Sequence, residues 1–288
     1  MCNIWQKCDH SGEILPEAYE KLPQSLLHIN ITGGEPFLRE DLVEIAAAII
    51  RRCPNADIII STNGFAVDLI KEKVRRILEL SARISVAISM DGIGEKHNSI
   101  RGVANGYNRS LAAITSLKAM GVKLKIAFTL GNYNARELQA VYELADFFGL
   151  EFSLALIHSS ENYFSKYNEI IRSRDMENAI FWLIQKELKT NNYKRWGRAY
   201  FAYGVSEFLK KGKRILPDYS GILNIFIDPC GNIYPNNVSD KPIGRLENLE
   251  DGFNNLESAN KKNWMMCTAR AAIKKHWIRA GWWILWNK

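Results

Sequence analysis

Apolar and polar positions alternate on two length scales along the first 160 residues. Short runs rich in β-branched residues are each followed by a longer stretch in which apolar residues recur at helical spacing. The short runs lie at 27–32, 57–62, 84–90, 123–130 and 151–157. Stretches such as 38–53 and 67–80 indicate amphipathic helices between them. The alternation predicts βαβ units and a parallel sheet with both faces covered.

Parallel βα repeats form either a doubly wound sheet or a full or partial barrel. A dinucleotide site of the first kind needs G-x-G-x-x-G after the first strand, and the chain has none there. Four short motifs instead follow successive strands: TGGEP, STNG, SMDG and TLGN. Barrels collect their chemistry at the carboxyl ends of their strands, so we favour an α/β partial barrel.

The second half of the chain predicts a different organisation. Residues 162–212 have a helical pattern, and two β-like runs then flank the segment 229–232, which predicts a hairpin. A final helix follows. We therefore expect a core at 1–212 and a small α+β appendage at 213–288.

Composition and charge exclude several classes of protein. The five cysteines are an odd number at irregular spacings, and neither a signal peptide nor a membrane-spanning apolar run is present, which favours a cytoplasmic protein. Of the net charge of +7, residues 257–288 carry +6, with seven Lys/Arg and one acid. The rest of the chain is nearly neutral, so no nucleic-acid partner is expected.

The segment TGGEP has the strongest chemical signal. Gly33 and Gly34 let the backbone approach a ligand closely, and the Glu35 carboxylate can accept hydrogen bonds from an ammonium group. Pro36 stands where a helix favours proline, at its first position.

The ordered set of motifs, with MCNIW before it and EKHNSIRG after it, resembles the radical S-adenosylmethionine (SAM) superfamily over residues 1 to about 160. Members of that family bind a [4Fe–4S] cluster through C-x3-C-x2-C. The resemblance implies a partial (β/α)6 barrel of the TIM type and these two cofactors. It also implies reductive cleavage of SAM to a 5′-deoxyadenosyl radical, which abstracts hydrogen from a substrate that the sequence does not identify. A reductant such as a flavodoxin or ferredoxin is the implied partner.

The resemblance also assigns residues. Cys2 matches the third cluster cysteine, and Gly33, Gly34, Glu35 and Pro36 match the segment that holds the SAM amino group. Ser61, Asn63, Ser89 and Asp91 match contacts to the ribose or methionine part. Arg101 lies where a cation could pair with the SAM carboxylate. Thr129 and Asn132 are weaker candidates.

The chain departs from the family at its start. Only Cys2 of the three cluster cysteines is present, and we expect Cys8, Asp9 and His10 to be incidental. This departure suggests a truncated chain that lacks two cluster cysteines and the first barrel strand, and that is inactive as written. The alternative is a non-catalytic protein of the same fold that binds SAM or a partner.

The C-terminal appendage resembles the SPASM or twitch modules that carry further clusters in this family. Cys230 and Cys267, even with His276, fall short of the usual four ligands, so we expect a degenerate module without a second cluster. His158, after the last strand, is either a proton donor or a strand cap. His97 is expected to organise the loop that carries Arg101.

The tail KKHWIRAGWWILWNK combines basic residues with four tryptophans. It predicts either an amphipathic helix on an anionic membrane surface or a helix whose tryptophans cover the open side of the barrel. We favour the second interpretation.

Overall fold

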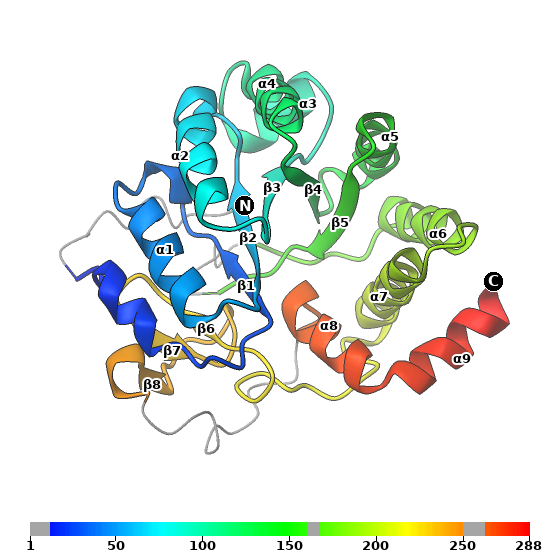
Figure 1. The fold of residues 1–288 in the computed structure, drawn as a ribbon. Helices are drawn as coiled ribbons and strands as arrows, with labels where there is room; N and C mark the ends of the chain where they lie inside the picture. The colour runs from blue at the N-terminus through cyan, green and yellow to red at the C-terminus, as the bar shows by residue number, and fades with distance from the viewer. Residues whose placement is uncertain (1–11, 161–167, 250–262) are drawn as a thin grey trace.

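The computed structural model describes residues 12–160, 168–249 and 263–288. Its main element is a sheet of five parallel strands in the order β1-β2-β3-β4-β5. The strands are β1 His28–Ile31, β2 Asp57–Thr62, β3 Ile84–Ser89, β4 Lys123–Leu130 and β5 Glu151–Leu156. The sheet curls into part of a barrel (Figure 1). All five predicted strands and the α/β partial barrel are confirmed.

Five helices lie along the outside of this sheet (Figure 1). They are α1 Leu42–Arg52, α2 Val67–Leu80, α3 Glu95–Arg101, α4 Gly106–Ala119 and α5 Leu138–Phe148. Short 3₁₀ helices lie at Pro16–Lys21, Pro36–Leu38, Ala135–Glu137 and Leu246–Asn248.

The first predicted helix begins later than expected. Pro36 opens only the 3₁₀ turn at Pro36–Leu38, and α1 starts at Leu42. The buried Lys73 ammonium lies 2.5 Å from the carbonyl oxygen of Arg39 and 3.3 Å from that of Glu40. These contacts hold the segment between the 3₁₀ turn and α1.

In the part of the chain that the structure describes, the two faces of the sheet differ: one is buried and the other is partly exposed, contrary to the prediction that both are covered. On β4, the residues Leu124, Ile126, Phe128 and Leu130 are buried, whereas those between them are exposed or half-buried. β2 and β5 alternate in the same way. The concave face is lined by small or polar side chains, and register pairs Ser61 with Ala87, Ser89 with Ala127 and Thr129 with Ala155.

Two long helices and a small antiparallel sheet follow the barrel. The helices are α6 Arg174–Leu188 and α7 Tyr193–Lys211, and the strands are β6 Phe226–Ile227, β7 Asn232–Tyr234 and β8 Gly244–Arg245. β6 and β7 pair as the predicted hairpin, whose turn is held by Asp228: its Oδ1 accepts from the amides of Cys230 (3.0 Å) and Asn232 (2.8 Å). The single final helix that we predicted is two helices, α8 Met266–Lys275 and α9 Trp277–Asn287.

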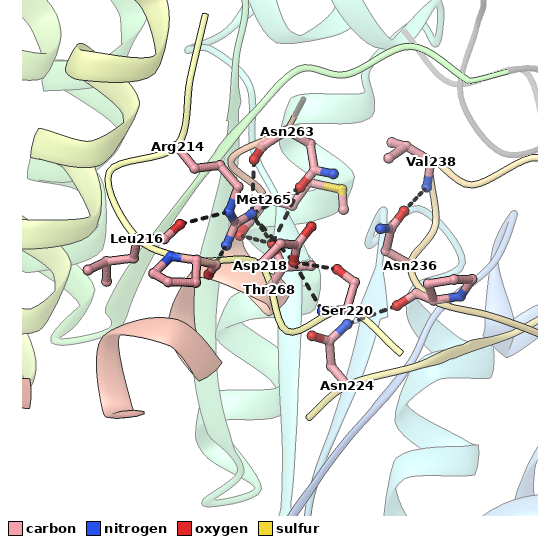
Figure 2. A network of polar contacts seen from close by, with 12 residues as sticks. Arg214, Leu216, Asp218, Ser220, Asn224, Asn236, Val238, Asn263, Met265 and Thr268 are labelled. Atoms are coloured by element: carbon pink, nitrogen blue, oxygen red, sulfur yellow. Dashed lines mark hydrogen bonds and ion pairs between the residues drawn. The ribbon is translucent and has the colours of Figure 1, made fainter. Parts of the chain in front are cut away.

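The C-terminal segment packs onto the barrel at several places. The indole of Trp264 is fully buried against α7, and its Nε1 donates to the carbonyl of Phe201 at 3.0 Å. The Lys274 ammonium of α8 lies 2.8 Å from Nε2 of His28 at the start of β1. Figure 2 shows a buried polar network around Arg214, which donates to the carbonyl of Asn263 and to the Thr268 hydroxyl, both at 2.9 Å. No helix among the described residues is long and apolar enough to cross a membrane.

Candidate functional site

The carboxyl ends of the parallel strands meet at one edge of the half-barrel, and most of the predicted site residues gather there. Glu35 follows β1, Ser61 and Asn63 end β2, and Ser89 and Asp91 end β3. A side-chain carbon added at Gly33 would meet no atom within 4 Å, so there is open space beside the Glu35 loop.

The Glu35 carboxylate is held by the next strand end. Its Oε1 accepts from the Thr62 hydroxyl at 2.8 Å, and its Oε2 accepts from the amide of Asn63 at 2.8 Å. The amide of Phe37 donates to Oε1 at 3.3 Å. The sequence analysis missed Thr62, although it stands inside the STNG motif. These bonds fix the first two motifs to each other.

Burial raises the pKa of Glu35, although the hydrogen bonds from Asn63, Thr62 and Phe37 act in the opposite direction. A carboxylate that has lost water in this way gains from a cationic ligand, because a nearby positive charge favours its ionised form. Glu35 is half-buried and can therefore receive one.

Ser61 and Asn63 play different parts at the end of β2. The Ser61 hydroxyl lies on the concave face and donates to the side-chain oxygen of Asn30 at 2.9 Å. The side-chain oxygen of Asn63 accepts from the amide of Phe65 at 2.8 Å, and its carbonyl accepts from the Ser110 hydroxyl. Gly64 has φ of 80°, which lets the chain turn back sharply into α2.

Asp91 is fully buried, and its carboxylate is already occupied. Oδ1 accepts from the amide of Thr129 at 2.8 Å, and Oδ2 forms an ion pair with Nη2 of Arg101 at 2.5 Å. A direct contact between the Asp91 side chain and a cofactor, as the resemblance implied, does not fit this burial. Asp91 instead positions Arg101, whose half-buried guanidinium is the group that remains open to a ligand.

His97 organises this loop, as predicted. Its Nδ1 accepts from the amide of Asp91 at 3.2 Å, which requires the neutral ring. Burial and the nearby Arg101 lower the pKa of His97 to about 4. The sequence analysis missed Glu137, which accepts from the amide of Ile93 at 2.9 Å, and Asn134, which donates to the carbonyls of Asp91 and Thr129.

The weaker candidates lie at the end of β4. Thr129 is half-buried and contributes its amide to Asp91. The Asn132 amide faces the backbone of Ile171, with contacts of 2.7 and 3.2 Å, so this side chain is used to hold the segment before α6.

His158 lies at the same edge, two residues beyond β5. Its ring is buried and bonds to the backbone carbonyl of Trp264, and burial lowers its pKa to about 4. Among the described residues Nε2 has no hydrogen-bond partner. His158 is therefore neutral and ties the barrel rim to the C-terminal segment. Its two predicted roles, proton donor and strand cap, stay predictions.

Cys2, Cys8, Asp9 and His10 lie outside the described residues. Within the described ranges, no group of three or more His, Cys, Asp or Glu could hold a metal ion, and Cys53 and Cys267 are free thiols. Cys53 is buried, and its thiol lies 3.3 Å from the carbonyl of Pro23.

Comparison with known proteins agrees with this geometry. The profile of the Radical SAM superfamily matches residues 11–145. Residues 11–145 thus form a radical SAM domain. Proteins of this superfamily use a [4Fe–4S] cluster and SAM.

Two curated relatives show how much of each chain is matched. The chain is 36% identical over 121 residues to pre-heme d1 synthase of Dinoroseobacter shibae, which covers 42% of this chain and 29% of that protein. It is 24% identical over 246 residues to the sporulation killing factor maturation protein SkfB of Bacillus subtilis, covering 84% of this chain and 56% of SkfB. The chain thus spans only part of the length of these relatives.

The solved structure of native anSMEcpe with bound AdoMet has a similar fold. It superposes with a TM-score of 0.57 at 17% identity, over 93% of this chain and 87% of the other. The likeness extends through the C-terminal segment as well as the barrel.

Proposed function

We propose that this chain is the core of a radical SAM enzyme that binds SAM at the carboxyl-terminal edge of the half-barrel. The observation that carries the proposal is the placement of Glu35, after β1, and Arg101, at the end of the α3 helix that follows β3, at the same edge of the sheet. Coulombic interaction between these two groups contributes to the pKa of Glu35, so they share one electrostatic environment.

The amino-acid end of SAM carries an ammonium and a carboxylate, and this edge offers a partner for each. Glu35 would accept from the ammonium, and the Arg101 guanidinium would face the carboxylate as a charge-assisted donor. Gly33 and Gly34 would present backbone groups without side chains in the way. On the concave face beside them, the Ser89 hydroxyl would donate a hydrogen bond to the ribose or methionine part, and the Ser61 oxygen, whose proton is used on Asn30, would accept one.

The remaining parts of the site follow from the family. Cys2 would be one thiolate ligand of the [4Fe–4S] cluster. Bound together, the cluster and SAM supply hydrogen-atom abstraction from a substrate, with an electron from a protein of the flavodoxin or ferredoxin class. The small side chains of the concave face would leave space for that substrate, and the segment that carries Trp264 would help to exclude water from the edge.

SAM binding tests the site without requiring turnover. Equilibrium dialysis with labelled SAM should show binding that weakens at least about tenfold in Glu35→Gln, since a charge-assisted hydrogen bond is lost. Glu40→Gln is the matched control, because Glu40 is exposed on the same loop. Equal affinity of both variants would reject the proposed role of Glu35.

The reaction is tested separately. Anaerobic reconstitution with iron and sulfide, followed by reduction, should yield 5′-deoxyadenosine in a chain preceded by a C-x3-C segment. SAM binding without 5′-deoxyadenosine in that chain would favour the non-catalytic SAM-binding alternative.

A further inference from the structure

Helix α9 is apolar on two opposite faces. One face packs onto α7: Ala280 is buried, and the ring of Trp283 stacks on Tyr203 with centroids 4.6 Å apart. The other face carries Trp277, Ile278, Trp282, Leu285 and Trp286, which are 58–82% exposed. At 100° per residue these five side chains fall within one half of the helix circumference.

This exposure contradicts the interpretation that the tryptophans of the tail cover the barrel. Only Trp283 of the four packs inward, while Trp286 is 82% exposed and Trp277 is 69% exposed. Isolated exposed hydrophobic residues are common, but a contiguous apolar face of five large side chains marks an interaction surface.

Cations border this face at its N-terminal end. A groove of about 470 Å³ at the junction of α8 and α9 is lined by Lys275, His276, Trp277, Ile278, Arg279 and Trp282. Neither Lys275 nor Arg279 forms an ion pair with a carboxylate of the described ranges. Tyr219 contacts two of the lining residues. Its hydroxyl lies 2.8 Å from Nε2 of His276, and the Lys275 ammonium lies 4.4 Å from the centre of its ring.

We propose that the outer face of α9 docks on an anionic phospholipid surface. Tryptophan is suited to the boundary between headgroups and acyl chains, where its ring is buried and its N–H stays hydrated. The groove with Lys275 and Arg279 would receive a lipid phosphate while Trp282, Leu285 and Trp286 enter the acyl boundary. This inference does not depend on the proposed SAM chemistry.

Charge decides between a lipid surface and a second copy of the chain. Residues 257–288 carry seven Lys/Arg and one acid. Two copies that met through this face would bring Lys275 and Arg279 of each copy together, which opposes association. An anionic bilayer is attracted by the same cations, so only the lipid surface matches both the apolar and the charged part of the patch.

Co-sedimentation of the full chain with vesicles tests the proposal. We expect binding to vesicles with 30% phosphatidylglycerol in phosphatidylcholine, little binding to pure phosphatidylcholine, and weaker binding at high salt. Trp282→Ser/Trp286→Ser should lower the partition coefficient at least about tenfold. Phe147→Ser/Phe181→Ser is the matched control, because both phenylalanines are exposed on other helices.

Charge reversal gives an independent readout. Lys275→Glu/Arg279→Glu should lower binding about 30-fold or more, since each cation near an anionic surface contributes about fivefold. Lys71→Glu/Arg75→Glu reverses two exposed cations at the same spacing on α2 and should leave binding unchanged. Absence of binding to anionic vesicles would overturn the proposal. So would a concentration-dependent dimer that Trp282→Ser/Trp286→Ser abolishes while vesicle binding persists.

Discussion

Nη2 of Arg101 lies 2.5 Å from Oδ2 of Asp91, and the Asp91 side chain is fully buried while that of Arg101 is 19% exposed. The pair thus connects the interior of the barrel to its functional edge. A buried carboxylate is costly unless it is paired, so Asp91 depends on Arg101 for its stability and Arg101 depends on Asp91 for its position.

Asp91→Asn should therefore destabilise the fold by about 2 kcal/mol, because it leaves a partly buried guanidinium without its counter-charge. Urea unfolding measures the effect. Asp175→Asn breaks the exposed pair with Arg136, at 2.8 Å, and should cost less than about 0.5 kcal/mol. Similar losses in the two variants would show that the Asp91–Arg101 pair has no special role.

The neutral state of His97 predicts a loss of stability in mild acid. Its pKa is about 4 in the folded chain, below the ordinary value of 6.5, so the unfolded chain binds the extra proton first. The contribution of His97 to the free energy of unfolding is complete above pH 6.5 and falls as the pH drops toward 4. Between pH 7 and pH 5 the loss is about 2 kcal/mol. His97→Gln should reduce the difference between the free energies of unfolding at these two pH values by that amount, as measured by urea unfolding.

Lys96→Gln, an exposed change on the same helix, is the control for His97→Gln. If the two variants keep the same pH dependence as the unmodified chain, His97 does not set it.

Two glycines of α7 should respond to alanine in opposite ways. A side-chain carbon at Gly204 would overlap the indole ring of Trp264, so Gly204→Ala should cost about 3 kcal/mol or displace the C-terminal segment. A side-chain carbon at Gly197 would meet nothing within 4 Å, and Gly197→Ala should stabilise the helix by about 0.5–1 kcal/mol. Thermal unfolding of both variants measures these changes in stability. A Gly204→Ala variant as stable as the unmodified chain would contradict the observed packing.

Arg214 should be essential to the C-terminal segment. Its side chain is 4% exposed, and burial lowers the pKa of its guanidinium, yet it makes hydrogen bonds to Leu216, Asn263 and Thr268. Arg214→Met would leave several buried acceptors unpaired and should cost about 3 kcal/mol. Arg245→Met, which removes an exposed arginine, should change the free energy of unfolding by less than about 0.5 kcal/mol. An equally small effect at Arg214 would contradict the network in Figure 2.

The sequence predicted the strands well because their apolar residues recur at a fixed short period. It also located Glu35 and Arg101, because the motifs that hold them follow strand ends in order. It did not predict the half-open concave face, although Lys125 and Thr129 on β4 alternate with buried residues. The burial of Asp91 against Arg101 was out of reach, because burial of a carboxylate depends on packing between distant segments.

The change of pattern in the sequence predicts two units, 1–212 and 213–288. The bond from His158 to the Trp264 carbonyl, together with the Trp264 indole that fills the space above Gly204, gives the two parts a common interior. A shared interior links their melting: unfolding of the C-terminal part would expose the barrel rim and α7 at once. Heat should therefore denature the chain in a single calorimetric transition. The C-terminal part would then make unfolding cooperative, as well as cover the barrel rim and α7.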